Sequence, residues 1–308
     1  MSNKLTKLDV LREMHYRGLI KKGSKEDRDY HWLTKGLEGE LDMLQRLKDK
    51  IKDRARVLHD VSIDCNGWTQ IDLLVLWDKL WWVIEVKNYW GIFRVEGDKN
   101  YLNDQPLRKN YLMDMSNRIR IVEELASSID KQIQVQGSFI LINEDGDLQI
   151  DQKPAFPILT RNQINLHIDP IILNQPAASP KLIKYYLQQI QQYHKSFPDD
   201  LPQINPQALN DCQKGVRCPH CQTYFTQKSD RRLHCNSCQL DSYKHDLVLD
   251  LYKQYCTLNY AKENITIREL FDFSEKYIGT DTIRQTIKNH AIYRHRSNRS
   301  YISNVHQY

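Results

Sequence analysis

The segment that decides the fold is TQIDLLVLWDKLWWVIEVKNY, residues 69–89. It consists of two apolar runs divided by Asp78 and Lys79, which indicates two antiparallel strands joined by a two-residue turn. In this arrangement Trp77 faces Leu80 across the turn. Side chains on both faces are almost all apolar, as in strands that are covered on each side. The sequence therefore predicts a buried hairpin at the centre of a sheet.

The same register brings three charged side chains together at one end of the hairpin. Asp72 lies opposite Glu85, so their Cβ atoms would be roughly 4.5–5.5 Å apart, and Lys87 shares that face two residues further on. Burying two carboxylates without a cation is costly, whereas a hard divalent ion such as Mg²⁺ favours such oxygens. That ion can polarise a phosphoryl oxygen and generate hydroxide, and Lys87 could orient the water or stabilise charge on the phosphate. The alternative is a structural ion-pair network.

A fourth acidic candidate, Glu40, precedes the hairpin. Apolar residues at spacings of three and four predict a helix over residues 34–52. Its expected apolar face consists of Leu37, Leu41, Leu44, Leu47 and Ile51. Glu40 falls on that face, where a carboxylate either belongs to the site or lies at the edge and reaches solvent.

The elements that follow indicate a compact α/β domain. Strands are expected at residues 57–63, 135–142 and 156–160, and a second long helix at residues 106–129. The order helix, strands, helix, strands is typical of a sheet flanked by helices.

Three motifs occur in order along this domain: GLEGE at 36–40, QID at 70–72 and IEVKNYWG at 84–91. Together they resemble the nuclease-related domain (NERD), a family of the PD-(D/E)xK restriction-endonuclease-like superfamily. The resemblance covers residues 34–161 and implies an α/β nuclease core, with a mixed sheet flanked by helices, that cleaves phosphodiesters with Mg²⁺ or Mn²⁺. It assigns the catalytic roles to Glu40, Asp72, Glu85 and Lys87, with Asp72 and Glu85 as metal ligands and Gln70 shaping the site.

One position departs from the family pattern. The family's next helix usually begins with Pro and has Gln three residues later, whereas PLRK here has Lys109 at that position. A lysine can still contact phosphate, but the family's role for that side chain does not transfer to it. Arg108, Arg118 and Arg120 are on the same predicted helix and are interpreted as a solvated face.

The cysteines are concentrated in one segment, because six of the seven lie in residues 212–256. An odd number, clustered in a chain without an export signal, favours metal binding over disulfides. CPHC and CNSC, separated by 13 residues, form the pattern of a zinc ribbon in which four thiolates hold one structural Zn²⁺. Iron is the less favoured metal. The expected ligands are Cys218, Cys221, Cys235 and Cys238.

The last third of the chain is basic. Residues 212–308 hold 15 Lys and Arg against nine Asp and Glu, although the whole chain has a net charge of only +5. Such an excess favours a polyanionic partner, with a solvated surface as the alternative.

This segment ends in a pattern that resembles a winged helix-turn-helix. Thr266 and Glu269 form a capping box that opens one helix. Two further helices are expected, one before it at 247–258 and one after it at 281–290, and a hairpin at 292–303. The side chains expected to bind nucleic acid are Arg284, Gln285 and Lys288 on that helix, with Arg294, Arg296 and Arg299 around the hairpin tip. The alternative is a winged helix that binds protein.

The expected division of the chain follows from these patterns. Six prolines and many glutamines in residues 170–210 mark a linker that contains one helix. The parts are an N-terminal extension, a nuclease-like domain, the Pro/Gln-rich linker, a zinc ribbon and a winged helix-turn-helix, at residues 1–33, 34–170, 171–210, 211–240 and 241–308.

Together these features predict a Mg²⁺-dependent nuclease whose zinc ribbon and winged helix bind nucleic acid, with duplex DNA favoured. Two alternatives stay open: a DNA-binding or regulatory protein that keeps the nuclease fold without cleaving, and an RNA-directed nuclease. No run reaches the ~18 apolar residues of a membrane helix, and the N-terminus lacks the apolar core of a signal peptide. We therefore expect a soluble, cytoplasmic protein without a membrane partner, and leave a homodimer open.

Overall fold

The computed structural model of the protein describes residues 5–152, 154–195, 200–288, 293–296 and 299–303. Its contacts divide it into two compact units. One is Leu33–Pro198, and the other combines Met1–Trp32 with Asp199–Tyr308. The boundary falls within helix α2 (Lys25–Ile51), which starts earlier than the predicted helix.

A five-stranded mixed sheet forms the centre of the Leu33–Pro198 unit, in the order β1-β2-β3-β7-β9. The first three strands are antiparallel neighbours, whereas β7 pairs in parallel with both β3 and β9. The strands span Arg56–Asp64, Trp68–Leu76, Leu80–Lys87, Gln134–Leu141 and Ile158–Thr160. This architecture confirms the predicted mixed sheet of an α/β domain.

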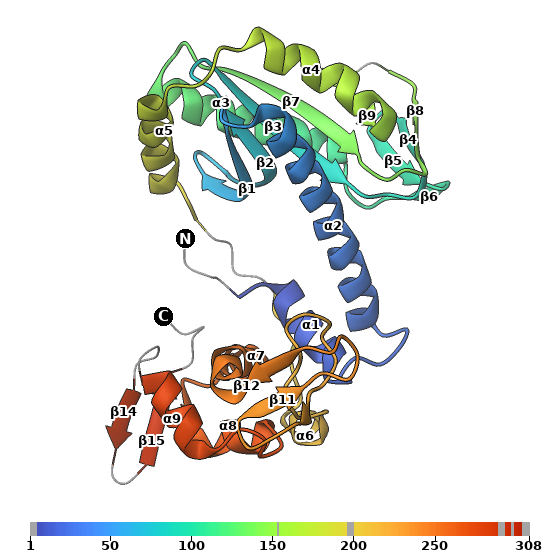
Figure 1. The fold of residues 1–308 in the computed structure, drawn as a ribbon. Coiled ribbons are helices and arrows are strands. Elements are labelled where there is room, and N and C mark those ends of the chain that lie inside the picture. The colour runs from blue at the N-terminus through green and yellow to red at the C-terminus, as the bar shows by residue number, and fades with distance from the viewer. Residues whose placement is uncertain (1–4, 153, 196–199, 289–292, 297–298, 304–308) are drawn as a thin grey trace. The chain divides into compact units, whose positions relative to one another are not determined.

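Helices cover both faces of this sheet (Figure 1). Helices α3 (Tyr111–Ile129) and α5 (Pro180–Gln192) share an apolar core with one face. Helix α2 and helix α4 (Ile164–Asn174), which follows the short 3₁₀ turn η1 (Arg161–Gln163), pack on the other. Helix α5 lies within the expected linker, and it buries Tyr186 and Ile190 in the core that contains α3.

A smaller four-stranded sheet, in the order β6-β5-β4-β8, continues the chain beyond β3. Its strands are β4 (Gly91–Glu96), β5 (Lys99–Leu102), β6 (Gln105–Pro106) and β8 (Gly146–Ile150). The side chain of Asn103 fixes the start of β4. It accepts a hydrogen bond from the Ile92 N–H at 2.9 Å and donates one to the Trp90 carbonyl at 3.1 Å. A Cβ at Gly91 would lie 1.9 Å from Asn103 Oδ1, so this close contact requires glycine.

The central hairpin has the predicted register. Leu73 pairs with Ile84 and Leu76 with Trp81, and the Trp77 N–H donates to the Leu80 carbonyl at 2.9 Å across the turn. The strands lie between two cores, because alternate side chains of β3 enter the core with α3 or the core with α2. Both faces of the hairpin are therefore apolar because both are covered, as predicted.

The regular alternation of β1 is broken at Asp60, whose φ is 53°. Leu58 and Val61 are three residues apart, so they would point to opposite faces of a regular strand. Both are buried in the core that contains α3. The left-handed residue therefore reverses the alternation of side chains between the two faces of β1, although the pairing with β2 keeps the same register on both sides of it. This reversal lies beside the charged end of the central hairpin.

Helix α2 presents a somewhat different face to the sheet than predicted. Met43, Leu47 and Ile51, at intervals of four, are fully buried, whereas Leu41 is 47% exposed. The prediction was wrong for Leu41 because the buried stripe is centred on Met43, which lies on another side of the helix. Gly39 packs so tightly that an added Cβ would lie 2.8 Å from both Asn88 and Ile142.

Helix α3 begins at Tyr111, later than the predicted start at Pro106. Pro106 belongs to β6, and the segment after it is bound to the small sheet through Asn100. The Asn100 carbonyl accepts from the Leu107 N–H at 2.8 Å, and its side chain accepts from the Tyr111 N–H at 2.7 Å. These contacts delay the helix until Asn110, whose side chain caps it.

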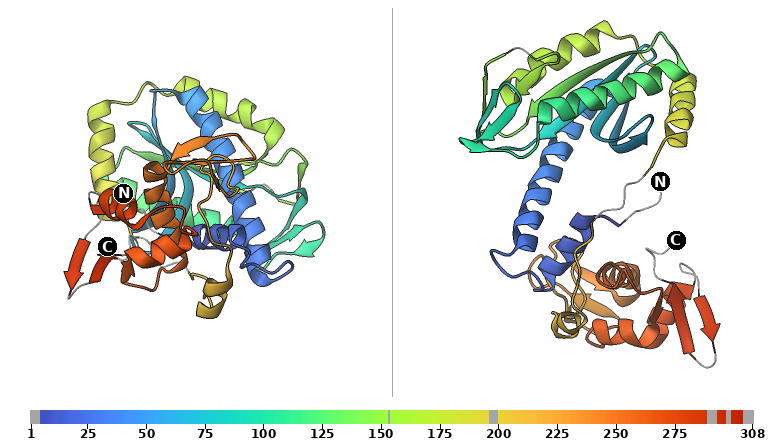
Figure 2. Two further views of the ribbon diagram at one scale, coloured as in Figure 1. Left: turned by 60° about the horizontal axis from the view of Figure 1, so that its bottom comes forward. Right: turned by 180° about the vertical axis from the view of Figure 1, so that it is seen from behind.

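The second unit contains a small three-stranded sheet in the order β10-β11-β12 and a helical segment (Figure 2). A short hairpin lies between the two cysteine pairs, since Thr226 pairs with His234. Its elements up to the helical segment are α1 (Lys7–Tyr16), α6 (Pro206–Asp211), β10 (Thr226–Gln227), β11 (Arg232–His234), β12 (Asp241–Tyr243) and η2 (Lys244–Leu247).

The helical segment ends in a second three-stranded sheet. Its order is β13-β15-β14, with antiparallel pairing throughout. The elements are α7 (Val248–Leu258), β13 (Asn264–Thr266), α8 (Ile267–Phe273), α9 (Thr280–Lys288), β14 (Tyr293–Arg296) and β15 (Arg299–Ser303). The predicted capping box of Thr266 and Glu269 opens α8, and Ile283 and Ile287 of α9 are fully buried.

Helix α1, which lies in the expected N-terminal extension, is held in this unit by buried charges. Glu13 pairs with Arg17 at 2.9 Å and also with Arg217 of the cysteine-rich segment. Arg17 donates to the carbonyls of Gln213 and Gly215 at 3.1 and 2.9 Å. All three charged side chains are at most 5% exposed, so α1 is part of the core of the second unit.

None of the helices in the described residues is long and apolar enough to cross a membrane.

Candidate functional site

The charged end of the central hairpin is organised around Glu85, whose side chain is 2% exposed. Lys87 Nζ lies 2.6 Å from Glu85 Oε1. On the other oxygen, Arg118 Nε of α3 lies 3.3 Å from Oε2, but it donates its hydrogen to the Gln70 carbonyl at 2.8 Å. Glu85 Oε2 is therefore buried without a hydrogen bond.

Asp72 lies where the predicted register puts it, next in line after the Leu73–Ile84 pair. Its Oδ2 accepts a hydrogen bond from the Val86 N–H at 2.8 Å. Burial and, secondly, the charge of Glu85 raise the pKa of Asp72 to about 7, although Lys87 and the Val86 N–H oppose the shift. The two carboxylates thus repel one another in a space with little water.

Lys87 supplies positive charge to this pair. Burial by itself would lower the pKa of Lys87, but the charges of Glu85 and Asp72 outweigh that effect and raise it above its ordinary value. The ammonium also lies 5.5 Å from the centre of the Tyr111 ring. Lys87 is therefore a cation at neutral pH, held on the face that carries both carboxylates.

Glu40 approaches from α2, on the opposite face of the sheet. Its Oε2 lies 2.8 Å from His59 Nε2 of β1, and this hydrogen bond is the main reason that the pKa of His59 is raised. The charge of Glu40 also contributes to the raised pKa of Asp72. The structure therefore brings Glu40 to the edge of the site, with His59 as its direct partner.

Sequence reasoning missed both His59 and Arg118. The prediction that Arg118 lies on a solvated helix face is wrong, because its side chain is 20% exposed and reaches Glu85. Arg120 does lie on the solvated face, where it pairs with Glu124. Arg108 and Lys109 are exposed and precede α3. No spacing signal in the sequence separates Arg118 from Arg120.

Gln70 supports the site through two hydrogen bonds. Its exposed side chain donates to Asp60 Oδ1 at 2.7 Å, and its carbonyl anchors Arg118. Asp60 is the left-handed residue of β1, so Gln70 supports the distorted part of the sheet beside the carboxylates.

The donor set fits a hard divalent cation. Asp72 and Glu85 offer carboxylate oxygens, the ligands that Mg²⁺ and Mn²⁺ prefer. Glu85 Oε2 is buried without a hydrogen bond, which is costly unless a cation or another donor satisfies it. Burial, and secondly the charge of Glu85, raise the pKa of Asp72, so the ionised carboxylate pair is costly in this site without an added cation.

The four cysteines form a separate cluster. The sulfur atoms of Cys218, Cys221, Cys235 and Cys238 all lie within 4.8 Å of one another. Each Cys-x-x-Cys pair closes a similar turn, because the N–H of Gln222 donates to Cys218 and that of Gln239 to Cys235, both at 2.9 Å. Both glutamines have positive φ, 65° and 62°. Four converging sulfurs are compatible with one tetrahedral Zn²⁺.

The residues expected to bind nucleic acid are described in part. Arg284, Gln285 and Lys288 are exposed on α9, and Arg284 pairs with Asp281 at 2.6 Å. The backbones of Arg294, Arg296 and Arg299 belong to β14 and β15, with Arg296 opposite Arg299. Their side chains lie outside the described residues.

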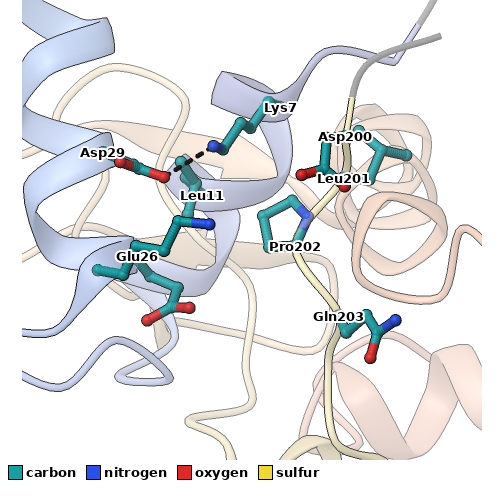
Figure 3. Close-up of a pocket in the computed structure, with 9 residues that line it drawn as sticks. Lys7, Leu11, Glu26, Asp29, Asp200, Leu201, Pro202 and Gln203 are labelled. Atoms are coloured by element: carbon teal, nitrogen blue, oxygen red, sulfur yellow. Dashed lines mark hydrogen bonds and ion pairs between the residues drawn. The ribbon is translucent and has the colours of Figure 1, made fainter. Parts of the chain in front are cut away.

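A cavity of about 210 Å³ lies in the second unit, between α1, the start of α2 and residues 200–203 (Figure 3). Lys7 and Asp29 form an ion pair of 2.7 Å in its wall, and Glu26 and Asp200 line it. No motif in the sequence predicts a role for these residues. The mixed charges of the wall already pair in part with each other.

Comparison with known proteins identifies the class of the first domain. Residues 35–142 match the family model described as nuclease-related domain (NERD), as the motifs in the sequence indicated. The matched stretch contains Glu40, Asp72, Glu85 and Lys87. The chain therefore carries a nuclease-related domain with a mixed α/β core. No curated protein and no solved structure matched the chain.

Proposed function

We propose that this protein is a metal-dependent nuclease of the PD-(D/E)xK type that acts on DNA. The observation that carries the proposal is the buried Glu85 carboxylate, which has one oxygen on Lys87 and the other without a hydrogen bond. It lies beside Asp72 in the stretch that matches the nuclease-related domain. A buried carboxylate pair with an adjacent lysine is a costly arrangement that catalysis explains.

In this proposal each side chain has a distinct task. Asp72 and Glu85 hold Mg²⁺ or Mn²⁺, which would polarise the phosphoryl oxygen and make its bound water a stronger nucleophile. Lys87 Nζ orients that water or stabilises the negative charge that builds on the phosphate. Glu40 is oriented by His59 at the edge of the site, where its negative charge adds to that of the ligands.

The second unit would hold the nucleic acid. The element order α7-β13-α8-α9-β14-β15 and the sheet order β13-β15-β14 support a winged helix-turn-helix with α9 as its recognition helix. The cysteine cluster supports a zinc ribbon whose metal is structural, because four thiolates complete the tetrahedral shell. The basic excess of this part of the chain favours contacts to the phosphate backbone.

A cleavage assay tests the proposal. The full chain is incubated with duplex DNA, single-stranded DNA and RNA of the same sequence, with Mg²⁺ or with EDTA. We expect Mg²⁺-dependent cleavage of duplex DNA that disappears in Asp72→Asn. Cleavage confined to RNA would favour an RNA-directed nuclease. Tight DNA binding by a folded protein that cleaves none of the three substrates would favour a DNA-binding or regulatory protein.

A further inference from the structure

The guanidinium of Arg118 lies where it competes with a cation for Glu85. Lys87 occupies one oxygen of the carboxylate at 2.6 Å, and Arg118 Nε faces the other at 3.3 Å. Both oxygens of the candidate metal ligand therefore face positive charge from the chain itself. A divalent ion that binds Glu85 Oε2 has to share that oxygen with Arg118 or displace it.

Of the two cations, Arg118 is the one held less firmly on Glu85. Its Nε donates to the Gln70 carbonyl at 2.8 Å, so the contact with Oε2 is electrostatic without a hydrogen bond. Within the described residues, no hydrogen bond involves either η nitrogen of Arg118. A guanidinium that loses its carboxylate in a partly buried site requires another anion, and its planar fork fits phosphate oxygens.

We propose that Arg118 couples metal binding to phosphate binding in this site. Without metal, the guanidinium neutralises Glu85. When a divalent ion takes Glu85 Oε2, the η nitrogens of Arg118 bind a non-bridging oxygen of the substrate phosphate. Because such coupling is reciprocal, phosphate favours metal as much as metal favours phosphate. The proposal rests on the proposed nuclease function and adds a residue to it.

The test measures Mn²⁺ binding to the full, zinc-loaded chain from the electron paramagnetic resonance signal of free Mn²⁺. Each protein is titrated alone and with a DNA duplex that has N3′→P5′ phosphoramidate linkages, which resist cleavage and keep both non-bridging phosphate oxygens. The working pH is well above the Asp72 pKa of about 7, so that protons do not compete. The matched variants are Arg118→Gln and Arg120→Gln, which make the same change on one helix. Asp72→Asn defines the signal without site-bound metal.

We expect Arg118→Gln to bind Mn²⁺ about fivefold more tightly than wild type without DNA, the effect of removing one partly exposed ion pair. The DNA should then improve Mn²⁺ binding less than it does in wild type. Arg120→Gln should match wild type in both titrations. Arg118→Lys keeps the positive charge, so its Mn²⁺ affinity should stay as weak as that of wild type. This variant provides a second measurement if Arg118→Gln does not fold.

The outcomes separate this proposal from the proposed function. If wild type binds Mn²⁺ and cleaves DNA but Arg118→Gln behaves as Arg120→Gln does, the role of Arg118 is refuted and the nuclease function stands. If wild type takes up no more Mn²⁺ than Asp72→Asn, the metal-dependent function itself is refuted, and the coupling is refuted with it.

Discussion

Asp72 Oδ2 accepts a hydrogen bond from the backbone N–H of Val86, at 2.8 Å. The contact replaces the next step of the β2–β3 ladder, which ends at the Leu73–Ile84 pair. This hydrogen bond ties the Asp72 side chain to β3, the strand that carries Glu85 and Lys87. The three charged groups are therefore held in fixed positions relative to one another. This rigidity favours a site that is formed before a ligand binds.

Lys87 should be required for cleavage. Lys87→Ala is expected to lower the rate at least about a hundredfold, since it removes a preorganised cation beside the reacting phosphate. The matched control is Lys79→Ala, because Lys79 lies in the turn of the same hairpin and pairs with exposed Asp130. Initial rates on a fluorescent duplex compare the two. Equal rates in both variants would remove Lys87 from the site.

The stability of the metal-free protein should depend on the ionisation of Asp72. A carboxyl whose pKa is raised in the folded state stabilises the fold fully below its ordinary value of 3.8, and this contribution is lost as the pH rises through about 7. Asn resembles the protonated carboxyl, so Asp72→Asn should gain roughly 1–3 kcal/mol over wild type towards neutral pH.

Urea denaturation of both proteins, in buffer freed of divalent ions with a chelating resin, measures this difference. Added Mg²⁺ should reduce it by stabilising only the wild type. If the difference in unfolding free energy between the two proteins is the same below pH 3.8 and above about pH 7, the ionised Asp72 carboxylate does not destabilise the fold.

The cysteine cluster should hold about one Zn²⁺ per chain, because four thiolates complete one tetrahedral shell. Cys218→Ser combined with Cys235→Ser should lose the metal and loosen the unit that contains it. Cys212→Ser, a buried cysteine outside the cluster, is the control and should keep the zinc. Elemental analysis after gel filtration gives the stoichiometry. Full zinc content in the double variant would refute the ligand set.

The buried pair of Glu13 and Arg217 should be needed to hold α1 on the second unit. Arg217→Met leaves part of the Glu13 charge uncompensated, which costs about 3–5 kcal/mol for a buried pair. Exposed Arg231→Met should cost little. Hydrogen exchange followed by mass spectrometry should show faster exchange in α1 and residues 213–224, but not in β2 and β3. Unchanged exchange in α1 would mean that the pair does not hold it.

Lys288 on α9 should contribute to nucleic-acid binding by the full chain. Neutralising one phosphate contact reduces the slope of log affinity against log salt by about one unit, so Lys288→Ala should flatten it by that amount. Lys262→Ala, which removes a lysine paired with Glu269 in the same unit, should not. Fluorescence anisotropy across a salt series compares them. Identical slopes would favour a winged helix that binds protein.

The sequence by itself determined the parts of this protein that depend on local patterns. The register of the central hairpin, from Leu73 with Ile84 to Leu76 with Trp81, followed from two apolar runs and a two-residue turn. Beyond the last pair, Asp72 lies close enough to Glu85 for the charge of Glu85 to raise its pKa. The turns around the cysteine pairs and the capping box of Thr266 are equally local, because their hydrogen bonds join residues a few positions apart. Such features survive in any tertiary arrangement.

Only the tertiary structure decided the contacts between elements. Arg118 differs from Arg120 by about 200° around α3, and the packing of that helix on the sheet decides which of them reaches Glu85. His59 meets Glu40 because it shares with Val57 the face of β1 that α2 covers. Glu13 meets Arg217 across 204 positions of sequence. No periodicity encodes these pairs, since each depends on how two separately formed elements pack to bury their apolar faces.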